Sequence, residues 1–424
     1  MKKNVKKYFS KKTQNSGKRV LTITATFPSL IQPWLINQLL QIISHGGDNR
    51  IIARRSELGV YASGIDKYNL LDNYLIVPEK KSKLILSLLN CFQSVDSLLA
   101  LLRGIFKYFK VFNSKNFTVK EKLYSISLLP YLGMKDIDII HSHSEMAGYK
   151  FLPIIESLEV PFVITFHGLP PAGVKPLEAS ERKRYLNGAS VILVNTEFAK
   201  KQYVSLGANP EVIKIIPQGI KLDEFVFVSK TFPHDKEINI LTVGRFHPDK
   251  GQKYAIQAVA SLIKQGFNIK YRLVGNGPDK VKLIQLATSL GIIDHVEFYS
   301  SVSDDELRNI YTLSHIFILP SLKDRNGLHE ETQGVVLQEA QASGLIVIAT
   351  KTGGIPECID DGVSGFLVNE RSSDDIESAL SKLLSSPDQW DMYQKLGRDW
   401  VETHYDINII GDRLNEVYEH IISN

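Results

Sequence analysis

The sequence of 424 residues contains few cysteines and no long apolar run. Its two cysteines, Cys91 and Cys358, cannot form a disulfide framework or a structural zinc site, and they fit a reducing compartment. No stretch of about 18 to 20 consecutive apolar residues occurs, so the sequence predicts no transmembrane helix.

A strong charge of either sign is also missing over most of the chain. Lys and Arg total 50 and Asp and Glu total 46, a net charge of +4, and we expect no nucleic-acid partner. The exception is residues 1–19, which hold eight Lys or Arg and no Asp or Glu. No apolar region follows, so this is not a secretory signal. We expect a flexible solvated tail, and the alternative is a tail attracted to an anionic membrane.

Short β-rich runs alternate with helical stretches along the sequence. Buried strands are expected at 19–24, 137–141, 162–165, 191–195, 239–243, 271–274, 296–299, 316–319 and 347–349. Helices are expected near 33–44, 145–158 and 197–206. Such alternation is typical of parallel sheets joined by helical crossovers. The predicted fold class is therefore α/β, with two doubly wound halves that face each other across a cleft.

Residues 80–112 are helical in pattern and rich in both Leu and Lys. One interpretation is a helical hairpin packed on the first domain. The other, which we favour, is a surface that leans on a membrane with its cations toward lipid headgroups.

Two glutamates stand out in the second half. Glu331 follows the apolar run 316–319, and Glu339 lies in an apolar segment that predicts a helix stopped by Gly344. A carboxylate in a packed helix is costly unless it accepts hydrogen bonds, and sugar or ribose hydroxyls are suitable donors. The alternative is an exposed Glu on an amphipathic helix.

The turn at 243–251 carries two cations after a predicted strand. Gly244 lets the backbone approach a ligand, and Arg245 and Lys250 can converge on one anion. A nucleotide diphosphate needs such a partner, because negative charge grows on it as a glycosidic bond breaks. The alternative is a surface turn with two solvated cations.

Three further turns are candidates. The helix start at Gly334, Val335 and Val336 offers backbone N–H groups to diphosphate or sugar oxygens. Gly277 belongs to a Gly-x-Gly turn that lacks the third glycine of a dinucleotide fingerprint, and no Walker-type phosphate loop occurs. The glycines at 353–354 are interpreted as conformational.

Histidines cluster in the first half. His167, at the end of a strand, is by itself most simply a structural hydrogen-bonding residue. His141 and His143 can place two imidazoles on one face of a strand, but no third ligand is evident and we predict no metal site.

Several of these motifs, taken in their order along the chain, resemble those of a known protein family. Glu331, Glu339, the run Ala-x-Ala-Ser-Gly at 340–344 and the stretch 347–368 resemble the donor-binding core of retaining GT-B glycosyltransferases of family 4. The likeness covers roughly 20–370 and is strongest to bacterial exopolysaccharide transferases of the colanic-acid and amylovoran type. Their N-terminal signature is echoed by residues on the expected acceptor side, namely Phe27, Pro28, Trp34, Asn37 and Gln38.

The resemblance implies a role for each candidate. Arg245 and Lys250 would stabilise the departing diphosphate, and Gly277 would lie near the nucleotide. Glu331 would bind the sugar hydroxyls, Glu339 the ribose, and His167 the sugar from the opposite domain. Two departures from the family stand out, Thr332-Gln333-Gly334 in place of Gly-Phe-Gly and Ile31-Gln32-Pro33 in place of Ser-Glu-Thr.

The resemblance also implies an organisation in five parts. They are a basic flexible tail at 1–19, an N-terminal acceptor-side Rossmann-like domain at 20–225, a linker at 226–237, a C-terminal nucleotide-sugar-binding Rossmann-like domain at 238–390, and C-terminal helices at 391–424. A return of the last helices to the N-terminal domain is left open.

The implied activity is transfer of a sugar from a nucleotide-diphospho-sugar, without a metal or other cofactor, to a glycan or lipid-linked acceptor. The implied setting is exopolysaccharide or lipopolysaccharide biosynthesis in the cytoplasm, with peripheral contact at the inner face of the membrane. The alternatives are a nucleotide-sugar epimerase on a similar fold and a catalytically silent partner subunit that binds nucleotide sugar.

Overall fold

The structure is a computed structural model that describes residues 17–28, 33–57, 65, 70–77, 94–169, 175–233, 236–300, 302–324 and 330–423. Cys91, most of the basic tail, residues 80–93 and two residues of the Ile31-Gln32-Pro33 departure lie outside these ranges. Among the described residues, no helix combines the length and the apolarity that a membrane span requires.

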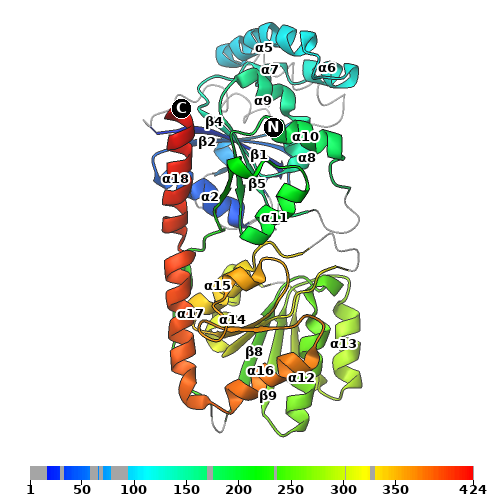
Figure 1. The fold of residues 1–424 in the computed structure, drawn as a ribbon, viewed down its shortest axis with the longest axis vertical. Helices are drawn as coiled ribbons and strands as arrows, with labels where there is room; N and C mark the ends of the chain where they lie inside the picture. The colour runs from blue at the N-terminus through cyan, green and yellow to red at the C-terminus, as the bar shows by residue number, and fades with distance from the viewer. Residues whose placement is uncertain are drawn as a thin grey trace.

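The first half of the chain forms a seven-stranded parallel sheet with the order β3-β2-β1-β4-β5-β6-β7 (Figure 1). Its strands are β1 (Arg19–Thr26), β2 (Asp48–Arg55), β3 (Tyr74–Ile76), β4 (Ile139–Ser142), β5 (Phe162–Phe166), β6 (Val191–Val194) and β7 (Ile213–Ile215). Its helices are α2 (Pro33–Ser44), α5 (Val95–Asn113), α6 (Val119–Ile126), α7 (Leu129–Leu132), α8 (Glu145–Lys150), α9 (Leu152–Leu158), α10 (Ala179–Asn187) and α11 (Glu197–Ser205).

The second half forms a six-stranded parallel sheet with the order β10-β9-β8-β11-β12-β13. Its strands are β8 (Ile238–Val243), β9 (Ile269–Val274), β10 (Val296–Tyr299), β11 (Ile316–Leu319), β12 (Ile346–Thr350) and β13 (Phe366–Val368). The helices of this half are α12 (Gln252–Lys264), α13 (Lys280–Ser289), α14 (Asp304–Leu313), α15 (Val335–Ala342), α16 (Ser373–Leu384), α17 (Trp390–His404) and α18 (Ile407–Ser423). In both sheets the order reverses beside the first strand, at β1/β4 and at β8/β11, where α/β proteins bind ligands.

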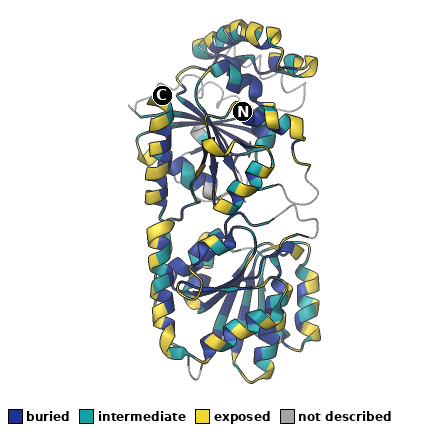
Figure 2. Ribbon diagram, in the orientation of Figure 1, coloured by how far each residue is buried: buried dark blue, intermediate teal, exposed yellow. Residues whose placement is uncertain are grey.

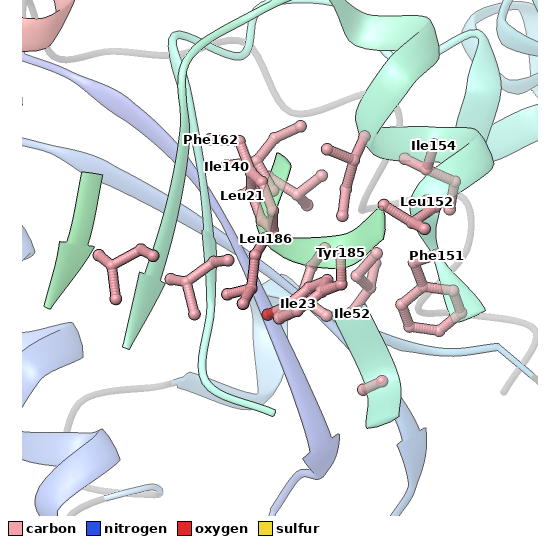
Figure 3. Packing of buried hydrophobic residues seen from close by; sticks show 14 of the residues in the cluster. Leu21, Ile23, Ile52, Ile140, Phe151, Leu152, Ile154, Phe162, Tyr185 and Leu186 are labelled. Carbon is pink, nitrogen blue, oxygen red and sulfur yellow. The ribbon is translucent and has the colours of Figure 1, made fainter. Parts of the chain in front are cut away.

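The central strands of both sheets are buried on both faces, which is why β6, β11 and β12 are nearly continuous apolar runs. In the first half, Leu21, Ile23 and Ile140 of the strands share a buried cluster with Tyr185 of α10 and with Phe151, which lies between α8 and α9 (Figure 3). Full burial of one such side chain contributes roughly 1.5–3 kcal/mol. A second cluster of the same kind surrounds β8 and β9.

The C-terminal helices connect the halves. In Figure 1, α17 runs beside the second sheet and α18 beside the first. Leu414, Val417 and Tyr418 of α18 share an apolar cluster with Val20 of β1. Between the two helices, Ile220 exchanges backbone hydrogen bonds of 2.9 Å with Tyr405 and Ile407.

The predicted strands are all present, and the helix predicted at 33–44 has the same bounds as α2. The segment predicted to be helical near 145–158 is helical, but it is divided in two, because α8 ends at Lys150 and α9 begins at Leu152. Pro153 lies in the first turn of α9, where a missing N–H costs no hydrogen bond, whereas one continuous helix would lose a bond there. No strand is described between Ile215 and Ile238, around the predicted linker.

Candidate active site

The carboxyl ends of β8, β9, β11 and β12 meet at one edge of the second sheet, and the turns there carry the predicted charged residues. Turns of the first half lie directly opposite. Thr196 Oγ1 donates to the Thr332 carbonyl at 2.9 Å, and Thr332 Oγ1 donates to the His167 carbonyl at 3.3 Å. The two edges therefore touch, and a site between them draws residues from both halves.

The turn after β8 brings Lys250 to Glu331, across 81 positions of sequence. The Lys250 ammonium forms an ion pair with Glu331 Oε1, and both side chains are mostly buried. Gly251, with φ of 63°, makes this approach possible, since a Cβ there would lie 1.9 Å from the Pro320 carbonyl oxygen. The predicted Lys250 and Glu331 are thus direct neighbours.

Arg245 belongs to the same turn but points to solvent. Its side chain is 52% exposed, and its Nη2 lies 3.5 Å from Oδ2 of the buried Asp249, which also contacts His247 Nδ1 at 2.6 Å. Gln252 Nε2 donates to the Arg245 carbonyl at 2.7 Å. The backbone is held while the guanidinium remains accessible to an anion.

Gly244 and Gly277 join two neighbouring turns. The Gly244 N–H donates to the Val274 carbonyl at 2.9 Å, and the Phe246 N–H donates to the Asn276 carbonyl at 3.0 Å. A Cβ on Gly277 would lie 2.3 Å from the Phe246 carbonyl oxygen. A Cβ on Gly244 would meet nothing within 4 Å, so the close packing of these two turns requires glycine at Gly277 and not at Gly244.

Glu331 is positioned by the glycine turn that follows β12. The Gly354 N–H donates to the Glu331 carbonyl at 2.7 Å, and a Cβ on Gly353 (φ 56°) would lie 2.1 Å from that oxygen. Ser321 Oγ lies 3.4 Å from Glu331 Oε1. The conformational role predicted for these glycines is thus to let their turn pack closely against the backbone of Glu331.

Glu339 lies in α15, which begins after Gly334 with the half-buried Val335 and Val336 and ends before Gly344 in the left-handed region (φ 81°). Burial raises the pKa of Glu339 to about 7. The Tyr311 hydroxyl donates to Glu339 Oε2 at 2.8 Å, which works against that rise. The two glutamates are therefore held by different partners, Glu331 by Lys250 and Glu339 by Tyr311.

Gln333 and Gln218 join the two halves by reciprocal hydrogen bonds. The Gln218 N–H donates to Gln333 Oε1 at 2.8 Å, and Gln333 Nε2 donates to the Gln218 carbonyl at 2.9 Å. Asn195 Nδ2 also lies 3.5 Å from Thr332 Oγ1. The two residues that depart from the Gly-Phe-Gly pattern, Thr332 and Gln333, thus both contact the first half.

His167 lies on the first-half side, with Nδ1 3.2 Å from Gln218 Nε2 and Nε2 3.3 Å from His143 Nδ1. Burial lowers the pKa of His167 to about 3, so the ring is neutral. His167 lines a pocket that is also lined by Asn37 and Gln38. The predicted acceptor-side residue Asn37 therefore lies in the same pocket as His167.

Phe27 and Pro28 lie at the end of β1, but Phe27 is a core residue. Its ring is 1% exposed and packs edge-to-face on Tyr74 at 5.7 Å. Any contribution of Phe27 to an acceptor site is therefore through the shape of the loop.

His141, one of the two histidines considered as metal ligands, contacts other side chains through both ring nitrogens. His141 Nδ1 lies 2.6 Å from the Tyr418 hydroxyl, and Nε2 lies 2.6 Å from Thr165 Oγ1. In the described part of the chain, no group of three or more His, Cys, Asp or Glu side chains is arranged to hold a metal ion.

Comparison with known families identifies this arrangement. Residues 224–400 match the glycosyl transferases group 1, and residues 101–224 match glycosyltransferase family 4. The chain belongs to this family. This family 4 member also shares the GT-B fold with solved glycosyltransferases, as predicted.

Two structures illustrate that fold. One is HepE of Anabaena in complex with UDP, with a TM-score of 0.68, 18% identity, and coverage of 95% of this chain and 100% of the other. The second is a glycosyltransferase from Rickettsia africae, with a TM-score of 0.69, 18% identity, and coverage of 96% and 100%.

Curated relatives resemble this family 4 member over part of their length. A D-inositol 3-phosphate glycosyltransferase of Mycolicibacterium smegmatis is 32% identical over 270 residues, which is 58% of this chain and 59% of the relative. A GDP-mannose-dependent alpha-(1-6)-phosphatidylinositol monomannoside mannosyltransferase of Mycobacterium tuberculosis is 27% identical over 237 residues, 54% of this chain and 62% of the relative. The matches thus span about three fifths of these relatives.

Four residues of the site were not predicted from the sequence of this family 4 member. Tyr311 holds Glu339, Ser321 lies beside Glu331, and Gln218 joins Gln333. Glu357 accepts hydrogen bonds from the Glu197 and Phe198 N–H groups, at 2.7 and 2.8 Å, and so caps α11 of the opposite half. The Gly-Gly-Ile-Pro-Glu string contains Glu357, but only the fold shows that its partner is 160 positions away.

Proposed function

We propose that the chain is a retaining glycosyltransferase that moves a sugar from a nucleotide-diphospho-sugar to a glycan or lipid-linked acceptor in cell-surface polysaccharide biosynthesis. The observation that carries the proposal is the Lys250–Glu331 pair at the carboxyl edge of the second sheet, opposite the His167 turn. Family membership supports glycosyl transfer, and the UDP complex of HepE and the GDP-mannose dependence of the mannosyltransferase support a nucleotide-sugar donor.

In this proposal the diphosphate lies between Arg245 and Lys250. Each charge-assisted hydrogen bond contributes roughly 1.5–3 kcal/mol, and these bonds strengthen as the leaving group gains charge. The accessible guanidinium of Arg245 suits this task. The two side-chain cations would then neutralise the diphosphate, as a divalent metal ion does in other enzymes. Measuring nucleotide binding with and without Mg²⁺ tests this.

The sugar and ribose are bound by carboxylates in the same proposal. Glu331, oriented by Gly353 and Gly354, would accept from the sugar hydroxyls, and Glu339 from the ribose. His167 would contact the sugar as a neutral hydrogen-bonding group from the first half. A sugar hydroxyl at His167 would replace one of its contacts with Gln218 or His143.

Retention follows if the acceptor hydroxyl attacks from the face that the diphosphate leaves. The C–O bond to the diphosphate breaks, the bond to the acceptor oxygen forms, and a phosphate oxygen of the leaving group takes the acceptor proton. No protein base is then required. Contact between the halves through Thr332 and Gln333 would exclude water and limit hydrolysis of the donor.

A thermal-shift screen with UDP, GDP, ADP and TDP, each with and without Mg²⁺, tests the donor site. A ligand that binds only the folded state adds about 2.7 kcal/mol at a hundredfold excess over Kd. We expect one diphosphate to raise the melting temperature, independently of Mg²⁺, and Arg245→Ala to abolish the rise. No response to any diphosphate would contradict the proposed site.

Turnover separates the activities. With the matching nucleotide sugar and an acceptor extract, we expect nucleoside diphosphate release and, by NMR, a product with the donor's anomeric configuration. An altered nucleotide sugar without acceptor would indicate the epimerase, and binding without release under any condition would indicate the silent subunit. An inverted product would overturn the retaining mechanism.

A further inference from the structure

Three histidines lie together at the carboxyl edge of the first sheet, and the proposed mechanism uses only His167. His141 lies in β4, His143 directly follows it, and His167 follows β5, in the buried interior of this half (Figure 2). The ring centres of His141 and His143 are 4.1 Å apart, and those of His143 and His167 are 5.6 Å apart. Burial lowers the pKa of all three rings, and charged rings at these distances would repel one another. The cluster is therefore neutral.

The partners of His167 determine which of its ring nitrogens carries the proton. A neutral imidazole has a proton on one nitrogen and a lone pair on the other. Gln218 Nε2 lies 3.2 Å from His167 Nδ1, and an amide NH₂ group can only donate, so Nδ1 is the acceptor. The proton is then on Nε2, which lies 3.3 Å from His143 Nδ1. The hydrogen bonds therefore run in one direction, from Gln218 through His167 to His143.

His141 is held in the same way by a second amide. Gln38 Nε2 lies 3.2 Å from His141 Nδ1, and His141 Nε2 lies 2.6 Å from Thr165 Oγ1. The Tyr418 hydroxyl, 2.6 Å from the same Nδ1, can donate to it as well. By the same argument, the proton of His141 is on Nε2 and is donated to Thr165. A side-chain amide on Nδ1 is thus a repeated arrangement in this cluster.

The backbone of Gln218 is fixed by the opposite half of the molecule. The Gln333 side chain accepts from the Gln218 N–H at 2.8 Å and donates to its carbonyl at 2.9 Å. The backbone of His167 is held from the same segment, because its carbonyl accepts from Thr332 Oγ1 at 3.3 Å. Contact between the halves therefore fixes both the His167 turn and the amide that contacts its ring. The two residues that depart from the family pattern, Thr332 and Gln333, act at this point.

We propose that Gln218 is a positioning residue that keeps the proton of His167 on Nε2, so that His167 donates a hydrogen bond to an oxygen of the donor sugar. This inference rests on the proposed function and specifies how one of its residues works. A sugar oxygen takes over the Nε2–H from His143, while the Gln218 contact on Nδ1 persists. Because Nδ1 is occupied and Nε2 is protonated, the ring offers no lone pair to the reactants. His167 is therefore a hydrogen-bond donor and not a general base.

Nuclear magnetic resonance of the full chain with ¹⁵N-labelled histidine measures the tautomer without any substrate. The chemical shift of a ring nitrogen depends on whether it carries a proton, and the His167 signals are those lost in His167→Gln. We expect Nε2 to be protonated and Nδ1 to be unprotonated across the neutral pH range. In Gln218→Glu the carboxylate can only accept, so Nδ1 should gain a proton. A parent ring protonated on Nδ1, or an unchanged ring in Gln218→Glu, would overturn the proposal.

Transfer assays measure whether this tautomer matters. Gln218→Leu should lower kcat about tenfold, the effect of one neutral hydrogen bond, while the diphosphate thermal shift stays parental because Arg245 and Lys250 remain. The direction of the His167 hydrogen bond is tested by two variants of equal size. His167→Gln supplies an NH₂ donor and should retain about tenfold more activity than His167→Glu, which only accepts. Equal losses, or more activity in His167→Glu, would show that His167 is not a donor.

The matched controls are Gln265→Leu and Gln265→Glu at the exposed end of α12, which should leave the tautomer and the rate parental. Gln218→Glu keeps the size of the side chain, so it tests the inference even if Gln218→Leu disturbs packing, which circular dichroism detects. A loss of transfer in Gln218→Glu without a change of tautomer would overturn the inference and leave the proposed function intact. Absence of transfer by the parent would contradict the proposed function, whereas the tautomer is measured independently of it.

Discussion

The two sides of the candidate active site differ in charge. The second-half side holds Lys250, Glu331 and Arg245, whereas the first-half side is built from neutral groups such as Gln218 and His167. Burial lowers the pKa of His167 to about 3 and that of His143 well below its ordinary value, so both rings are uncharged.

This difference suggests a division of labour. Charged partners suit a diphosphate, whose charge changes during reaction, and neutral hydrogen bonds suit sugar hydroxyls, whose charge does not. Changes on the second-half side should therefore affect nucleotide binding and rate together. Changes on the first-half side should affect rate and leave nucleotide binding nearly intact.

The largest expected effect is that of Lys250→Ala. Loss of one transition-state contact of this kind costs on the order of 10²–10³ in rate. The variant also leaves Glu331 without its ion-pair partner in a mostly buried position, so nucleoside diphosphate should bind more weakly. Transfer rate and thermal shift are the measurements, and Lys253→Ala, which removes an exposed lysine of the next helix, is the control. If Lys250→Ala transfers sugar at the parental rate, the proposed division of labour between the charged and the neutral side is wrong.

The second prediction concerns pH. Burial raises the pKa of Glu339 to about 7, so below that pH the carboxyl is protonated and cannot accept from both ribose hydroxyls. Nucleotide-sugar affinity should then fall up to about tenfold per pH unit below 7 and be constant above it. Without nucleotide the sign is opposite, because a raised folded-state pKa makes stability decrease as pH rises from the ordinary value toward 7.

Calorimetric titration between pH 5.5 and 8.5 measures this dependence. The intact nucleotide sugar is the suitable ligand, because a terminal phosphate titrates near pH 6, as phosphate monoesters do. Glu339→Gln should bind more weakly above pH 7 and lose the slope. If the slope persists in that variant, another group titrates. His167 should contribute no inflection in this range.

A smaller effect is expected from Gln333→Ala, which changes a second-half residue whose side chain binds the backbone of Gln218 on the neutral side. The variant removes two neutral hydrogen bonds to Gln218, each contributing about 0.5–1.5 kcal/mol, so kcat/KM should fall about tenfold. Nucleoside diphosphate binding should change less than twofold, because Arg245 and Lys250 remain. Gln265→Ala, at the exposed end of α12, is the matched control. Equal losses in binding and rate would contradict the division of labour.

Sequence patterns predicted the local parts of this protein well and its long-range contacts poorly. The buried strand β11 was predicted with its observed bounds, because a continuous apolar run is typical of two-sided burial. The edge strand β10, which is only partly buried, was also predicted with its observed bounds. The strand β2 was missed, because its apolar Ile51–Ala53 core is short and flanked by Asp48, Asn49 and three arginines. The assignment of Lys250 and Glu331 to one donor site came from family resemblance, and their direct contact was not predicted, since spacing alone does not bring residues 81 positions apart together.

The unpredicted partners are the residues whose role depends on the other half of the molecule. Gln218 and Gln333 are ordinary polar residues until the two sheets face each other, and Tyr311 is one aromatic residue on an amphipathic helix. Thr332 and Gln333 were noted only as departures from a family pattern. Their contacts show that this departure contributes directly to the junction between the halves.

The smallest predicted effect tests whether that junction also stabilises the first half. Glu357 of the second half caps the first turn of α11, and removal of a capping side chain costs about 0.5–2 kcal/mol. Because Glu357 is exposed, Glu357→Ala should lie near the lower limit, with transfer reduced by less than about threefold. Urea unfolding followed by proteolysis across α11 measures the loss, with Glu416→Ala on exposed α18 surface as control. An equal loss of activity in Glu357→Ala and Gln333→Ala would mean that the helix cap and the Gln333 contacts act as one unit. The division of labour would then lie between the charged and the uncharged contacts of the junction, and not between the two halves of the molecule.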